Sequence, residues 1–160
     1  NELERIFLKF KVKFYNNYPL IIFKEFSKLK AHKDVIDSIS LLKSKDITIV
    51  TLTNGSKENT IKLLKNNDLL SYISRCFSIN EIKIWKPNKK TYTYVCKKMN
   101  VPPSKTLMIA AHAWDIYGAK KAGLKTGYIT RYEKILSKIY TKPDVAENNC
   151  LSIIKRIKFN

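Results

Sequence analysis

An uncharged run, Ile47–Ser56 (ITIVTLTNGS), constrains the fold of this chain more than any other stretch. It opens with β-branched and apolar residues and stops at Asn54-Gly55, a pair that is typical of a turn. A short apolar run that ends at a turn signal indicates a strand buried on both faces, as in parallel sheets, and we place it at Ile47–Leu52. Ligands of open parallel sheets bind at the carboxyl ends of strands. Thr53 and Asn54 are therefore the first candidates for a functional site.

The remaining sequence alternates helix-like and strand-like patterns. Ser56 is placed to cap the helix that follows it, and His112–Asp115 reads as the loop after a second buried strand. Ile135–Tyr140 is either a short helix or a loop. The predicted helices are Lys33–Lys45, Lys57–Lys65, Lys89–Met99, Ile116–Ala122 and Cys150–Ile157, and the further strands are Cys76–Ile79, Thr106–Ala111 and Thr126–Thr130. This alternation predicts an α/β fold, a Rossmann-like parallel sheet with helices on both faces.

The first 30 residues differ from the rest in being both basic and aromatic. Apolar residues between Leu3 and Phe14 recur at a helical period, which predicts one amphipathic helix there. Pro19 is followed by the apolar run Leu20–Phe23 (LIIF). By periodicity alone this run is either a strand or a buried helical turn.

Composition narrows the class of protein. The formal net charge is +18, but lysine carries almost all of it, since arginine occurs only at Arg5, Arg75, Arg131 and Arg156. Proteins that read bases depend on arginine, so nucleic-acid binding is not the favoured function. Three cysteines without zinc-ligand spacing predict reduced thiols in the cytoplasm. No apolar run reaches the roughly 18 residues of a membrane span.

Polar residues gather after the predicted strands. Thr53 and Asn54 follow one strand, His112 and Asp115 follow another, and Lys86 lies in a loop before Pro87. Taken singly, these residues fit a tight turn, a surface lysine and an acid at a helix start. A lysine and an aspartate that converge over backbone amides form a plausible site for an anionic substrate.

Three segments, LTNGS, IKIWKPNKKTY and AAHAWDIYGAKKAGLKTGYI, together resemble the haloacid dehalogenase superfamily, and most closely the L-2-haloacid dehalogenases of type II. The resemblance runs from about Leu29 to Asp144. It implies that Thr53 binds the anionic group, that Lys86 neutralises a nucleophilic carboxylate, and that Asp115 positions Lys86 and the hydrolytic water. It also implies a substrate pocket lined by Asn54, Tyr92, His112 and Trp114.

The same motifs indicate which branch of the superfamily the chain resembles. Its phosphatases hold Mg²⁺ with two acids four positions apart, where this chain has Ala111 and Asp115. Loss of one carboxylate disfavours magnesium, so we expect no metal and no cofactor. The dehalogenase branch instead displaces the substituent at C2 by an aspartate, and water hydrolyses the resulting ester. Where that branch usually has Ser-Ser-Asn, this chain has Ala110-Ala111-His112, and an imidazole can do acid–base work near pH 7.

The largest departure from the family concerns the nucleophile. The family begins with a strand that ends in aspartate (FDxxGT), and the nearest counterpart, Phe23–Lys28 (FKEFSK), has lysine there. In the family, that first strand lies at the centre of the sheet, between the two strands that correspond to those of Thr53 and Met108 in this chain. We therefore expect residues 1–30 to be a helical remnant of a cap and residues 31–160 to be the α/β core, with the first strand and most of the cap missing. Either Leu20–Phe23 fills the slot, or the sheet gapes, or upstream sequence supplies the strand.

Three functions follow from these observations. The first is a hydrolase resembling (S)-2-haloacid dehalogenase, acting on a small anionic substrate of the 2-halo acid class, with a homodimer left open. The second is a truncated, non-catalytic remnant of such an enzyme. The third, least favoured, is a basic module that binds nucleic acid, for which binding would depend steeply on salt.

Overall fold

The structure, a computed structural model, describes residues 2–133 and 139–158. In these residues the α-helices are α1 (Glu2–Lys9), α2 (Tyr18–Phe26), α3 (Lys33–Ser44), α4 (Lys57–Lys65), α5 (Lys89–Met99), α6 (Ala113–Lys121) and α7 (Cys150–Arg156). The strands are β1 (Val50–Thr53), β2 (Arg75–Ser78), β3 (Leu107–Ala110), β4 (Lys125–Ile129) and β5 (Val145–Glu147). Short 3₁₀ turns occupy Leu70–Tyr72, Ile79–Glu81 and Pro103–Lys105.

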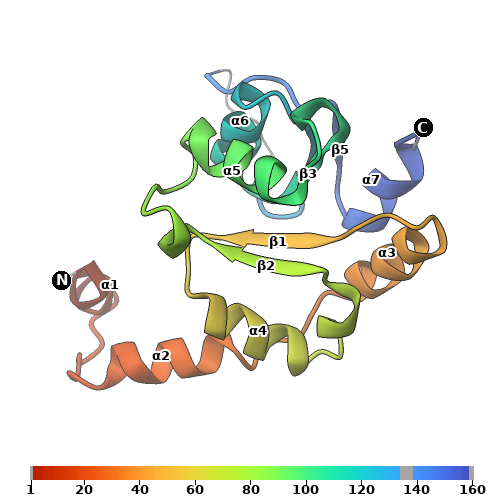
Figure 1. Cartoon of the computed structure of the whole chain (residues 1–160). Coiled ribbons are helices and arrows are strands. Elements are labelled where there is room, and N and C mark those ends of the chain that lie inside the picture. The colour runs from red at the N-terminus through yellow and green to blue at the C-terminus, as the bar shows by residue number, and fades with distance from the viewer. Residues whose placement is uncertain (1, 134–138, 159–160) are drawn as a thin grey trace.

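Every strand pair is parallel, as the alternating pattern predicts. β1 pairs with β2, and β4 pairs with β3 on one edge and with β5 on the other. α4 lies on one side of the β1–β2 sheet, while α5 and α6 lie on the other (Figure 1). The predicted α/β fold with helices on both faces is therefore confirmed.

The two sheets remain separate. Within residues 2–133 and 139–158, the only strand that pairs with β1 is β2 and the only strand that pairs with β3 is β4, so one edge of each carries no strand partner. Leu20–Phe23 lies inside α2 and does not fill this slot. Leu52 of β1 and Met108 of β3 nevertheless pack against one buried cluster of Tyr92, Cys96, Ala119 and Leu124. Both sheets thus share a hydrophobic core without sharing a ladder of hydrogen bonds.

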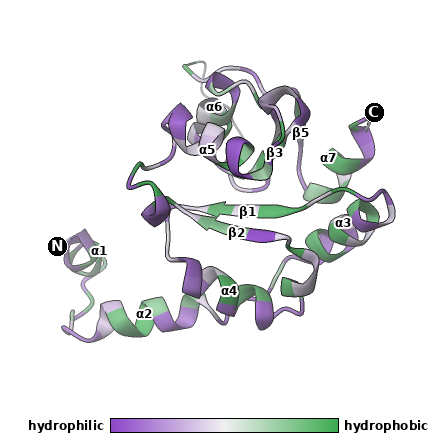
Figure 2. Cartoon of the chain, in the orientation of Figure 1, coloured by the Kyte–Doolittle hydropathy of each residue, from purple (hydrophilic) through white to green (hydrophobic). Residues whose placement is uncertain are grey.

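The N-terminal helices α1 and α2 contain no buried residue. Leu20 is 74% exposed, and Figure 2 shows hydrophobic residues along α2, at a distance from the sheets in Figure 1. The single helix expected to reach Phe14 is wrong, because α1 ends at Lys9 and Lys11 adopts a left-handed backbone. Phe14 folds back so that its ring centroid lies 5.5 Å from that of Phe7. That residues 1–30 are the remnant of a cap stays a prediction.

Other elements agree with the sequence to within a few residues. β1 begins at Val50 rather than Ile47, because Asp46 is left-handed and the Ile47 N–H still bonds to Leu42 at the end of α3. Ser56 caps α4 as predicted, accepting a 3.1 Å hydrogen bond from the Asn59 N–H. β5 was not predicted. The expected helix or loop at Ile135–Tyr140 falls mostly outside the described residues.

No described helix has the length and apolar content required to cross a bilayer.

Candidate active site

The loop after β1 is tied to the loop that carries Lys86. The Asn54 side chain accepts a 3.0 Å hydrogen bond from the Lys86 N–H and donates one of 3.4 Å to the Lys86 carbonyl. Thr53 Oγ1 accepts from the Gly55 N–H at 2.9 Å, which leaves the hydroxyl hydrogen of Thr53 available to donate. Asn54 therefore fixes the position of Lys86, and Thr53 presents a donor at the carboxyl end of β1.

The Lys86 ammonium lies at the centre of the site. Its Nζ donates to Asp115 Oδ2 at 2.6 Å and to the Leu52 carbonyl of β1 at 3.2 Å. The Lys86 and Asp115 side chains are only 8% and 7% exposed. In a pair buried this deeply, each charge depends on the other for its stabilisation, because little water reaches either one.

Tyr92 holds Asp115 from the other side. Its hydroxyl donates to Asp115 Oδ1 at 2.6 Å and lies 3.2 Å from the Asp115 carbonyl oxygen. Burial, with the Asp115 carboxylate beside it, raises the pKa of Tyr92 far above the ordinary value, so its hydroxyl remains a donor. Asp115 thus receives a neutral hydrogen bond on one oxygen and a cation on the other.

The predicted loop at His112–Asp115 is wrong, because α6 begins at Ala113. His112 takes the N-cap position, and its carbonyl accepts from the Asp115 N–H at 3.1 Å. The Ala113 N–H donates to Glu133 Oε2 at 2.8 Å, so a carboxylate from another segment satisfies the helix start. Asp115 and Trp114 therefore lie in the first helical turn, which brings Asp115 to Lys86.

The aromatic and imidazole rings predicted for the site lie beside this ion pair. The Lys86 ammonium lies 5.6 Å from the Trp114 ring centroid, and the His112 ring stacks on Trp114 with centroids 5.7 Å apart. The His112 side chain is 57% exposed. The structure thus brings Thr53, Asn54, Lys86, Tyr92 and Asp115 together, with Trp114 and His112 extending the site toward solvent.

Glu133 belongs to this neighbourhood and was missed from sequence. Its Oε1 lies 2.7 Å from His112 Nδ1, and the Tyr128 hydroxyl donates to its carbonyl at 2.8 Å and to Oε2 at 3.1 Å. The hydrogen bond with His112, followed by that from Ala113, holds the pKa of Glu133 below its usual range. Glu133 follows the carboxyl end of β4, so the strand-end rule applied to β4 would have found it.

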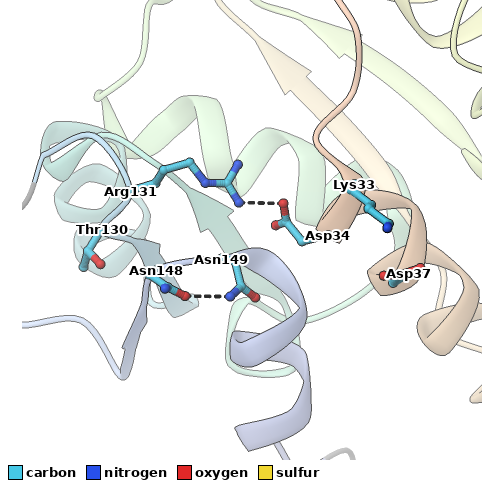
Figure 3. Close-up of a pocket in the computed structure, with 7 residues that line it drawn as sticks. All are labelled: Lys33, Asp34, Asp37, Thr130, Arg131, Asn148 and Asn149. Atoms are coloured by element: carbon cyan, nitrogen blue, oxygen red, sulfur yellow. Dashed lines mark hydrogen bonds and ion pairs between the residues drawn. The ribbon is translucent and has the colours of Figure 1, made fainter.

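A cavity of about 710 Å³ lies beside the starts of α3 and α7 (Figure 3). Within it, Asp34 pairs with Arg131 and accepts a hydrogen bond from the Cys150 N–H at 2.8 Å. It contains none of the predicted site residues, and we place the chemistry at Lys86 because the buried ion pair is there. Its lining is Lys33, Asp34, Asp37, Thr130, Arg131, Asn148 and Asn149.

Within residues 2–133 and 139–158, no three His, Cys, Asp or Glu side chains are grouped so that they could hold a metal ion.

The chain is similar in sequence to known proteins over most of its length. A family model described as haloacid dehalogenase-like hydrolase matches residues 2–123. The chain is 33% identical over 109 residues to (S)-2-haloacid dehalogenase 1 of Pseudomonas sp. (strain CBS-3), covering 68% of this chain and 48% of that one. It is 31% identical over 106 residues to (S)-2-haloacid dehalogenase 4A of Burkholderia cepacia, covering 66% and 46%. The chain therefore spans about half the length of these curated relatives.

Solved structures give the same fold. The L-2-haloacid dehalogenase RSc1362 superposes with a TM-score of 0.87 at 17% identity, covering 96% of this chain and 67% of that one.

Proposed function

Because the chain belongs to the haloacid dehalogenase-like hydrolases, we propose that it forms part of an enzyme that cleaves the carbon–halogen bond of a 2-halo acid by hydrolysis. The observation that carries this proposal is the buried Lys86 ammonium, held between Asp115 and the Leu52 carbonyl beside the end of β1. A fixed cation with a hydroxyl donor nearby binds the carboxylate of such an acid and stabilises a second carboxylate that attacks C2.

Each residue has a role in this scheme. Thr53 donates to the substrate carboxylate, and Asn54 positions Lys86 through its main chain. Asp115, held by Tyr92, orients the Lys86 ammonium and the water that hydrolyses the ester. Trp114 supplies an apolar wall against Lys86, and His112 lies next to it.

The attacking carboxylate is not Asp115. Both Asp115 oxygens are already bonded, to Lys86 and to Tyr92. Among the described residues, no other carboxylate pairs with Lys86. We infer that the nucleophile belongs to a strand in the slot between β1 and β3, whose carboxyl end would meet Lys86, and that residues 1–30 are the remnant of a cap over it.

That Lys86 pairs with no other carboxylate among the described residues also favours a second candidate. This candidate is a non-catalytic chain that keeps the fold but has no nucleophile. The test is halide release from (S)-2-chloropropionate by the 160-residue chain and by the chain extended at its N-terminus with a strand ending in aspartate. We expect turnover only from the extended chain, and none after that aspartate is changed to asparagine or after Lys86→Met. An extended chain that folds but releases no halide would reject the hydrolase function.

A cytoplasmic location and the absence of nucleic-acid binding stay predictions for this chain, and a homodimer stays an open alternative.

A further inference from the structure

The pair formed by His112 and Glu133 is built more firmly than a surface contact. Glu133 Oε1 lies 2.7 Å from His112 Nδ1, while Oε2 accepts from the Ala113 N–H at 2.8 Å. The Tyr128 hydroxyl, from a side chain that is 1% exposed, adds a third anchor to Glu133. The carboxylate is therefore fixed to both α6 and β4, and it holds the imidazole by a single nitrogen.

This arrangement defines which nitrogen of His112 can act. A carboxylate on Nδ1 favours the tautomer with hydrogen there, so Nε2 is the nitrogen that gains or loses the proton. Protonation adds a positive charge to a ring that Glu133 already holds against the indole of Trp114. The neutral and charged forms therefore occupy the same place, and the change in charge needs no movement.

Trp114 is shared between this imidazole and the Lys86 ammonium. The His112 ring is nearly parallel to the indole, with an interplanar angle of 11°, and Lys86 Nζ lies 5.6 Å from the indole centroid. His112 and Lys86 thus both lie close to the same indole ring. A Coulomb interaction acts between charges at such separations, reduced by solvent because the His112 side chain is 57% exposed.

We propose that His112, held by Glu133, is a positioning residue that makes anion binding beside Lys86 dependent on pH. Protonated His112 adds a second positive charge to the site and strengthens binding of a 2-halo acid carboxylate, and neutral His112 does not. This proposal rests on the proposed function, because it assigns regulation to the same substrate site. The charged or titratable groups near His112 are Glu133, which bonds to it, Tyr128, which donates to Glu133, and the Lys86–Asp115 pair, whose ammonium lies near the same indole.

The chain is well suited to a clean test, because its only histidines are His32 and His112 and its only tryptophans are Trp85 and Trp114. In a Trp85→Phe background, emission reports Trp114 alone. A charge that appears against the indole face changes that emission. The variant His112→Asn removes the titrating group with a side chain of similar size. His32→Asn is the matched control, because His32 bonds to Tyr132 and lies in none of the contacts described for the site.

Two measurements decide the proposal. Without ligand, Trp114 emission should depend on pH in the Trp85→Phe chain and with His32→Asn, and should stay flat with His112→Asn. With 2-chloropropionate as the probe, affinity should fall about threefold to tenfold as pH rises and His112 loses its proton, again only where His112 is present.

The possible results separate the two claims. If 2-chloropropionate binds with the same pH profile in His112→Asn as in the parent chain, the role of His112 is refuted and the substrate class stands. If Trp114 emission depends on pH through His112 but 2-chloropropionate binds at no pH, even to the chain extended by the aspartate strand, the proposed substrate class fails. If Trp114 emission does not titrate, or titrates equally without His112, the coupling itself is refuted.

Discussion

The Lys86–Asp115 ion pair makes a quantitative prediction about the stability of the chain. Asp115→Asn keeps the shape of the side chain and its contact with Tyr92 but removes the charge that faces the ammonium at 2.6 Å. With both side chains less than a tenth exposed, the orphaned cation cannot turn to solvent. Removing one partner of such a buried pair costs about 3–5 kcal/mol, although the pair as a whole contributes less than that. A loss of this size is a large share of the roughly 5–15 kcal/mol that holds a domain folded.

A control pair with the same geometry isolates burial as the cause. Lys28 and Glu25 also lie 2.6 Å apart, but their side chains are 56% and 55% exposed, so Glu25→Gln should cost less than about 1 kcal/mol. Urea unfolding followed by circular dichroism gives both free energies. The double variant Lys86→Met with Asp115→Asn should be more stable than the sum of the two single losses predicts. Equal losses for Asp115→Asn and Glu25→Gln would refute the claim that burial makes this pair decisive.

Two further predictions concern packing and acid stability. An added Cβ at Gly118 would meet the Pro87 carbonyl and ring, so Gly118→Ala should destabilise the chain by about 1–3 kcal/mol. The control Gly55→Ala should cost less, because its Cβ would meet only a side-chain oxygen at 3.3 Å. Thermal melting of the two variants compares the losses. Burial alone would raise the pKa of Asp34. The hydrogen bond from the Cys150 N–H and the ion pair with Arg131 together outweigh burial and lower that pKa. A lowered pKa in the folded state stabilises it at neutral pH, and this contribution is lost as pH falls below about 4. Asp34→Asn should therefore reduce the difference in unfolding free energy between neutral and acidic urea titrations.

The strand-end rule predicted the convergence of the site because it depends on local sequence. Thr53 is the last residue of β1, and Asp115 lies five residues beyond the end of β3. Parallel strands place their carboxyl ends at one edge of a sheet. That these residues lie close together can therefore be predicted without knowing any long-range contact. Glu133 obeys the same rule, but β4 is followed by no motif that draws attention to it, and its partner His112 is 21 residues earlier in the chain.

Where periodicity failed, the deciding interactions were absent from the pattern. Four apolar residues, Leu20–Phe23, cannot distinguish a period of two from one of 3.6. Pro19 at the start of α2 was the available signal, because proline is tolerated in the first turn of a helix. The start of α6 was misplaced because Glu133, and not a capping side chain within the local sequence, accepts the hydrogen bond from Ala113.

The Lys86 ammonium contributes both to the fold and to the candidate site. Its ammonium bonds to the Leu52 carbonyl of β1 and to Asp115 on the helix that follows β3, so it links the two sheets where no strand pairs them. The Leu52 carbonyl would otherwise lose a partner inside the protein, which is costly for a buried backbone group. A strand that entered the slot would compete for that carbonyl and free the ammonium to face a carboxylate at the strand's end. Under the proposed function, the contact between Lys86 and the Leu52 carbonyl is therefore the one that a strand in the slot would replace.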